Sequence, residues 1–200
     1  MGCDIHTRVE YFTTVNGEQA WFDGDHYVRN KYFDGKDEWE DELTVVDIYN
    51  GRNYALFSTL AGVRNYGDTE IIDEPRGIPS DANKFIKADY ERWGCDAHTP
   101  SWFTLKELID YQEAEPVVKY SGMISPEASV NLDNGIYPEE WCQGTSIKTY
   151  IRREWKKKSE VLVPLIDSLK ARCKELFYLW DDERVLEFVN KIRVVFWFDN

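Results

Sequence analysis

The chain closes with Ile192-Arg193-Val194-Val195-Phe196-Trp197-Phe198-Asp199-Asn200, a strongly apolar run. A continuous run of β-branched and aromatic residues is typical of a strand that is buried on both faces. We therefore expect this segment to lie in the centre of a sheet, beside the first strand of the chain. Such a pairing would carry Asp199 to the rim of the sheet near Asp4 or His6, depending on strand direction and register.

The opening segment, residues 3–12, alternates between two kinds of side chain and predicts that first strand. One face carries Cys3, Ile5, Val9 and Tyr11, and the other carries Asp4, His6, Arg8 and Glu10. We expect the first face to be buried and the second to be polar. Asn16-Gly17 predicts a hairpin turn, with a return strand over Glu18 to Phe22.

Capping residues and helical spacing predict four longer helices. They are expected over residues 53–63, from Ser80-Asp81 to about Trp93, from Leu105 with Thr104 and Glu107 as a capping box, and from Pro164 to about Trp180. A further strand is expected over residues 146–155. The fold class is then α+β: one domain over residues 1–200, with a mixed, mostly antiparallel sheet that contains both termini and helices packed on one face. Residues 23–50 and 112–145 are expected to be variable loop excursions, the second with one short strand near Val117 to Tyr120.

A five-residue pattern, Cys-Asp-x-His-Thr, occurs twice, at Cys3–Thr7 and at Cys95–Thr99. Asp and His two positions apart on an extended strand point to the same side. If the two strings meet in the fold, they bring together two carboxylates and two imidazoles, a set suited to a divalent metal such as Zn, Mn or Mg or to acid–base catalysis. The candidate metal ligands are Asp4, His6, Asp96 and His98, and the candidate catalytic residues are His6, His98 and Asp96. Two alternatives stay open, a metal-free ligand pocket and a structural role in which each Asp orients its neighbouring His.

The net charge of −13 argues against general binding to nucleic acid or to an anionic membrane, because contacts to phosphates need a basic surface. It leaves open a surface that imitates DNA. No run of about 18 apolar residues predicts a transmembrane helix, and the N-terminus lacks the pattern of a signal peptide. Four scattered cysteines are typical of reduced thiols, so a cytoplasmic protein is expected, and a homo-oligomer is open.

Arginine and aromatic residues suggest a second kind of site. Arg64 and Arg76 lie in or beside a long loop with a rigid Pro75–Pro79 segment, and a guanidinium can bind phosphate or carboxylate through two hydrogen bonds. Tyr66, Trp93 and Trp102 are candidates for stacking on a base. Alternatively, the arginines pair with the many acidic residues nearby.

Blocks along nearly the whole chain resemble a family of small proteins encoded in bacteriophage and prophage genomes. The resemblance rests on Met1–His6, Arg52–Tyr54 with Leu56-Phe57, Leu60–Arg64, Pro75–Pro79, Trp93, Asp96–His98, Leu105–Leu108 and Val195–Asn200. Members of that family often carry a second histidine where this chain has Pro100. The resemblance implies, by association, a phage accessory protein that counteracts a host defence, in the cytoplasm of the bacterial host.

Three functions are then expected in order of preference. The first is binding and sequestration of a small nucleotide-like signalling ligand in a pocket lined by aromatic residues and arginines. The second is a metal-dependent hydrolase, for instance a phosphodiesterase, in which the four Asp and His residues of the repeated string hold an ion that lowers the pKa of a bound water. The third is an acidic, DNA-mimic-like inhibitor of a host protein.

Overall fold

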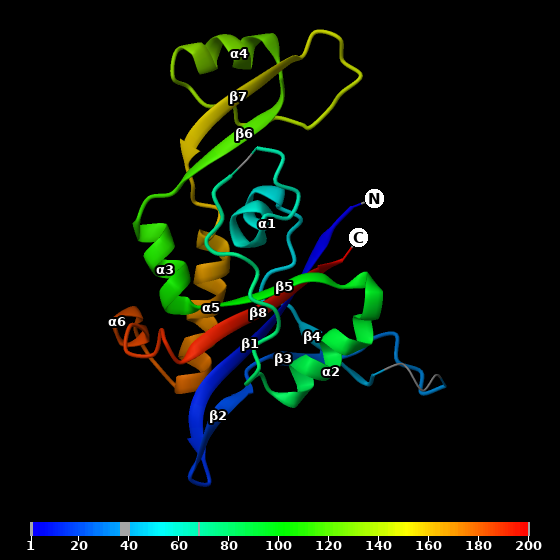
Figure 1. The fold of residues 1–200 in the computed structure, drawn as a ribbon, viewed down its shortest axis with the longest axis vertical. Coiled ribbons are helices and arrows are strands. Elements are labelled where there is room, and N and C mark those ends of the chain that lie inside the picture. The colour runs from blue at the N-terminus through cyan, green and yellow to red at the C-terminus, as the bar shows by residue number, and fades with distance from the viewer. Residues whose placement is uncertain (1, 37–40, 68, 200) are drawn as a thin grey trace. The chain divides into compact units, whose positions relative to one another are not determined.

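The computed structural model describes residues 2–36, 41–67 and 69–199, and it is an α+β fold, as predicted (Figure 1). The chain forms two compact units. The first consists of Met1–Arg52, Asp73–Asp110 and Leu162–Asn200, and the second of Asn53–Ile72 and Tyr111–Val161. None of the helices in the described segments combines the length and the apolar character needed to cross a membrane.

The first unit is built on a four-stranded antiparallel sheet in the order β2-β1-β8-β5. Its strands are β1 (Asp4–Val15), β2 (Glu18–Asp23), β5 (His98–Thr104) and β8 (Ile192–Asp199). β8 pairs with β1 on one side and with β5 on the other, so the apolar closing strand is central, as predicted. Residues 192–198 are all buried, which explains why the run has no alternation.

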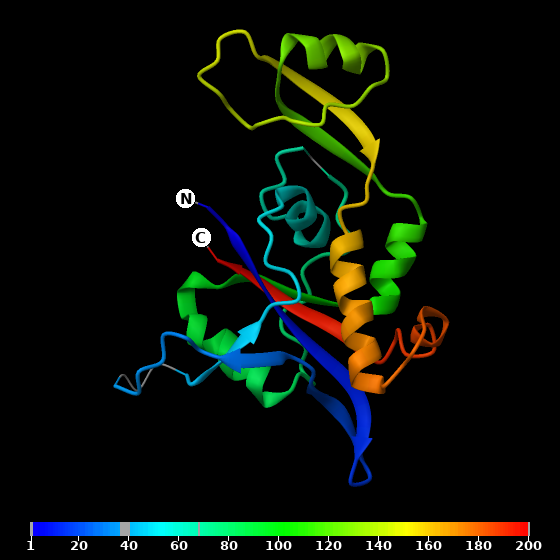
Figure 2. The ribbon, with the colours of Figure 1, turned by 180° about the vertical axis from the view of Figure 1, so that it is seen from behind.

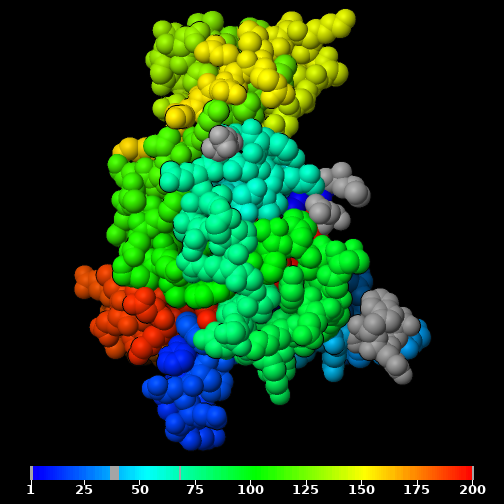
Figure 3. Space-filling model, in the orientation of Figure 1, coloured from blue at the N-terminus to red at the C-terminus, as the bar shows by residue number. Residues whose placement is uncertain are grey.

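Helices cover both faces of this sheet, which differs from the expected packing on one face. α2 (Lys84–Trp93) lies over the face that carries His6 and Arg8, whereas α5 (Val163–Phe177) lies over the opposite face (Figures 1 and 2). Atoms of α2 lie at the surface in the view of Figure 3. The prediction failed because residues 4–10 were expected to present a polar face to solvent, and their polarity is instead matched by polar groups of α2.

Local sequence signals set most element boundaries. Asn16 and Gly17 turn the β1–β2 hairpin with positive φ angles of 53° and 84°, as the Asn-Gly pair predicts. The capping box holds at the start of α3 (Leu105–Glu113), where Glu107 accepts the Thr104 N–H at 2.8 Å. α2 begins one turn later than expected, with Asn83 as its N-cap.

Two other segments depart from the expected pattern. The excursion over residues 23–50 contains a two-stranded ribbon of β3 (His26–Arg29) and β4 (Leu43–Val46), and residues 37–40 within it lie outside the described residues. α5 ends at Phe177, so Trp180 does not continue its apolar stripe and is 86% exposed. The short α6 (Asp182–Val185) and a 3₁₀ turn, η1 (Gly94–Asp96), complete the first unit.

The second unit contains α1 (Tyr54–Ala61), β6 (Val117–Ile124), α4 (Pro126–Asp133) and β7 (Ile151–Lys158). Asn53 caps α1 at the start of the expected helix, and Gly62 ends it in the left-handed conformation. β6 and β7 form an antiparallel ribbon around the stacked rings of Tyr120 and Trp155. Residues 112–145 are therefore more regular than expected, with a full strand and a helix.

Candidate functional site

The α2-facing side of β1 carries a row of three ionisable side chains, His6, Arg8 and Glu10. Each meets a different part of the segment that covers it. His6 packs on the ring of Trp93, Arg8 binds Asp89, and Glu10 accepts the Asn83 N–H at 2.6 Å. Arg8 and Glu10 are buried and His6 is half-buried, and the polar or aromatic partner of each group offsets the desolvation that burial imposes.

Arg8 is the centre of this row and is 8% exposed. Its guanidinium donates to Asp89 through Nε at 2.7 Å and to Asp47 through Nη1 at 2.8 Å, and Nη1 also donates to the Thr7 carbonyl. Burial by itself lowers the pKa of an arginine, but the carboxylates of Asp89, Asp47 and Asp25 outweigh it and raise the pKa of Arg8 above its ordinary value. Arg8 is thus a charged cross-link between β1, α2 and the segment after β4.

Asp25 lies at the open edge of β1, because β2 pairs with β1 only from Glu10 onward. Its Oδ1 accepts the Val9 N–H at 2.8 Å and its side chain is 2% exposed. Arg172 of α5 fixes this turn by donating to the carbonyls of Gly24 and Asp25. Burial raises the pKa of Asp25 to about 7, although the Val9 N–H and the Arg8 charge oppose the rise.

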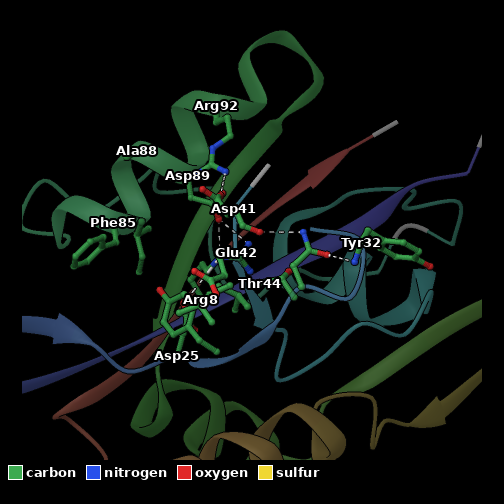
Figure 4. A pocket seen from close by; sticks show the side chains of 15 residues that line it. Arg8, Asp25, Tyr32, Asp41, Glu42, Thr44, Phe85, Ala88, Asp89 and Arg92 are labelled. Carbon is green, nitrogen blue, oxygen red and sulfur yellow. Dashed lines mark hydrogen bonds and ion pairs between the residues drawn. The ribbon is translucent and has the colours of Figure 1, made fainter. Parts of the chain in front are cut away.

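A cavity of about 820 Å³ opens beside these residues, between α2 and the β3–β4 ribbon (Figure 4). Its charged lining residues are Arg8, Asp25, Asp41, Glu42, Asp89 and Arg92. Its aromatic lining residues are Tyr27, Tyr32 and Phe85. Figure 4 shows Asp89 and Arg92 reaching from α2 toward Arg8 and Asp41 on the other side. The cavity has the size and the mixed lining of a small-molecule site.

The raised pKa of Asp25 predicts a pH-dependent stability that Asp25→Asn removes. A rise from 3.8 to about 7 in the folded state makes the folded protein bind a proton that the unfolded chain has released. Stability from this group is complete below about pH 4 and is lost as the pH rises through about 7. The free energy of unfolding of the wild type should therefore fall relative to that of Asp25→Asn by about 4 kcal/mol from pH 4 to pH 8, as measured by urea unfolding. Parallel curves for the two proteins over this range would contradict the assignment.

His6 forms a second polar arrangement at the rim of the sheet. Its Nε2 lies 3.1 Å from Oδ2 of Asp199, and Oδ1 of Asp199 accepts the Asp4 N–H. Asp4 is bound by Arg52 through two hydrogen bonds, and the hydrogen bond from Arg52 lowers the pKa of Asp4. The approach of Asp199 to Asp4 and His6 was expected from the strand order, and the antiparallel register Asp4–Asp199 produces it.

The two Cys-Asp-x-His-Thr strings do not converge, which corrects the expectation of a shared cleft. In the strand register, His6 lies opposite Trp197 and His98 lies opposite Phe198, and each histidine ring stacks on the ring opposite it. Trp197 and Phe198 are neighbours on one strand, so they point to opposite faces of the sheet, and so do the two histidines. Asp96 is exposed in η1.

The structure consequently gives no support to the predicted metal set of Asp4, His6, Asp96 and His98. Within residues 2–36, 41–67 and 69–199, no three His, Cys, Asp or Glu side chains are grouped so that they could hold a metal ion. Of the predicted catalytic residues, His6 is paired with Asp199. His98 is bonded through Nδ1 to Thr99 Oγ1 at 2.9 Å.

The predicted ligand-binding residues are also distributed over several places. Arg64 contacts the Tyr66 hydroxyl in the second unit, beside a hollow of only about 30 Å³. Arg76 forms ion pairs with Asp73 and Glu107 and lies over the ring of Trp102. The alternative considered for Arg76, pairing with nearby acids, is thus what the structure shows.

Trp93 packs on His6, and none of the five predicted ligand-binding residues is among the described residues that line the 820 Å³ cavity. Sequence reasoning missed Arg8, Asp25 and the residues of the β3–β4 ribbon. The sequence contained one signal. Arg8 lies within a predicted strand and Arg193 within an apolar strand, and a cation buried in a strand requires a carboxylate close to it. The position of Asp25 had no local signal.

Comparisons of the chain with protein-family models, with curated proteins and with solved structures found no match. The functional assignment therefore depends on the geometry of the cavity and on the groups that line it.

Proposed function

We propose that the protein binds a small organic molecule in the cavity between α2 and the β3–β4 ribbon. The observation that carries the proposal is a cavity of about 820 Å³ that combines aromatic rings with fixed charged groups. This volume lies within the roughly 300–1,000 Å³ that small-molecule sites occupy. Arg8 and Asp25 are held by hydrogen bonds from three directions, so the floor of the cavity is pre-formed and its ordering adds little cost to binding.

The proposal keeps the expected class of function, capture of a small ligand, and changes its location. The arginines and aromatic rings singled out in the sequence are replaced by Arg8, Arg92, Tyr32 and Phe85. In the setting that the resemblance to phage-encoded proteins suggests, the captured molecule is made in the bacterial host cell. The His6–Asp199 pair has the geometry of an acid–base dyad, but neither residue is among those that line this cavity.

Filling the cavity tests the proposal. Ala88 lines it and lies on the exposed side of α2, so Ala88→Trp places an indole in the cavity without disturbing the core. We expect ligand-observed NMR with a set of small aromatic compounds to show binders to the wild type, and Ala88→Trp to weaken them by at least about tenfold.

The matched control is Ala114→Trp, which makes the same substitution at an exposed position of the second unit that is not among the residues lining this cavity. It should bind the same compounds as the wild type. Equal binding by all three proteins, or no binder to the wild type, would refute the proposed site.

A further inference from the structure

We infer that the ligand of this cavity is an organic cation that carries an aromatic or other flat apolar group. This inference rests on the proposed function and specifies its ligand class. It also departs from the nucleotide-like ligand expected from the sequence, which would bring negative charge into the cavity.

The first support is the balance of charge among the described lining residues. Above the pKa of Asp25, as at pH 8, four carboxylates, those of Asp25, Asp41, Glu42 and Asp89, face two guanidiniums, those of Arg8 and Arg92. The lining of the cavity thus has the sign that attracts a cation and repels a phosphate.

The second support is that both guanidiniums are already bound. Arg8 is held by Asp89 and Asp47, at 2.6–2.8 Å, and Arg92 is paired with Asp41. An anionic ligand would have to compete with these carboxylates for the two guanidiniums.

The third support is the capacity that remains for hydrogen-bond donors. In the described part of the chain, the Glu42 carboxylate has no hydrogen bond or ion pair from another side chain. Oδ2 of Asp25 lies 4.0 Å from Nε of Arg8, beyond hydrogen-bonding distance, while its Oδ1 is used by Val9. Carboxylate oxygens of the cavity are therefore available to ammonium or guanidinium groups of a ligand.

The fourth support comes from the aromatic rings at the cavity. Tyr32 and Phe85 are 73% and 56% exposed, so their faces are accessible. Ammonium groups of the protein already lie over both rings, Lys31 at 4.8 Å from the Tyr32 centroid and Lys84 at 5.1 Å from that of Phe85. Each ring thus already has an ammonium group within cation–π distance.

Three probes of nearly the same shape test the charge preference: 2-phenylethylamine, 2-phenylethanol and phenylacetate. They are titrated into the wild-type protein at pH 8 and low salt, with affinity measured by NMR. We expect the amine to bind at least about tenfold more tightly than the alcohol and the carboxylate to bind least. The preference should decrease at 0.5 M salt, because the interaction is partly exposed to solvent.

Glu42→Gln should lower the affinity for the amine about threefold to fivefold and leave that for the alcohol unchanged. The control Glu91→Gln removes the same charge from an exposed position of α2 that does not line the cavity, and it should leave both affinities unchanged. An equal effect of the two substitutions would overturn the assignment of Glu42.

Tighter binding of phenylacetate than of the amine would overturn the inference, and so would failure of all three probes to bind. In either case, loss of other bound compounds in Ala88→Trp but not in Ala114→Trp would show that the cavity still binds ligands. The two proposals therefore fail separately.

Discussion

Glu10→Gln is expected to destabilise the protein by about 3–5 kcal/mol, because it removes the buried anion that pairs with Arg193 and leaves this buried cation with only the exposed carboxylate of Asp81. The Glu10 and Arg193 side chains are 0% and 2% exposed, and Nε of Arg193 donates to Oε2 of Glu10 at 2.7 Å. The guanidinium also lies over the ring of Trp21, at 3.9 Å from its centroid.

Urea unfolding measures this loss, and a double substitution distinguishes a broken pair from a general packing defect. Glu10→Gln combined with Arg193→Met removes both charges, and it should recover most of the stability. The exposed pair Lys106–Asp110 supplies the control, since Lys106→Ala should cost only about 0.3–0.5 kcal/mol. Losses of similar size in Glu10→Gln and Lys106→Ala would contradict the structural role given to the buried pair.

Arg8→Met is the second change for which we expect a large effect, about 3–5 kcal/mol at pH 8. Without the guanidinium, the carboxylates of Asp89, Asp47 and Asp25 face one another with little solvent. The pKa of Asp25, which burial already raises, then rises further because the opposing charge of Arg8 is gone, so stability falls as the pH rises through it. The loss should therefore be smaller at pH 5 than at pH 8.

Unfolding in urea at the two pH values tests this expectation. Arg92→Met is the matched control, because Arg92 lines the same cavity but is 59% exposed and pairs with one exposed carboxylate. It should cost less than about 1 kcal/mol and show little dependence on pH. A loss for Arg8→Met that is equal at pH 5 and pH 8 would mean that the three carboxylates do not interact through Arg8.

The repeated Cys-Asp-x-His-Thr string shows how far a motif can mislead. Its composition is unusual enough to suggest a shared site, and both copies do lie next to β8. However, His6 is opposite Trp197 and His98 is opposite Phe198. A difference of one position along β8 reverses the face on which a side chain lies, and no feature of the pentapeptides themselves sets that register.

The cavity shows the converse case, a site without a motif. Its walls come from Asp25 after β2, from residues 41–45 in and before β4, and from α2. Each of these segments has an ordinary composition for an acidic protein, and the β3–β4 ribbon was expected to be a loop. The carboxylates and rings form a site only because the fold brings them together around Arg8, which itself was expected to face solvent.

By itself, the sequence determined the local structure of this protein: the hairpin at Asn16-Gly17, the caps at Asn53 and Thr104, and the central position of the closing strand. These features depend on backbone conformations and burial patterns that a few neighbouring residues impose. Only the tertiary structure decided that α2 covers the polar face of β1, that the two histidines lie on opposite faces, and that a charged cavity forms beside Arg8. The reason is that a buried charged group is stable only with partners, and here the partners come from segments that are distant in the sequence. Their interaction energies arise only when those segments pack together.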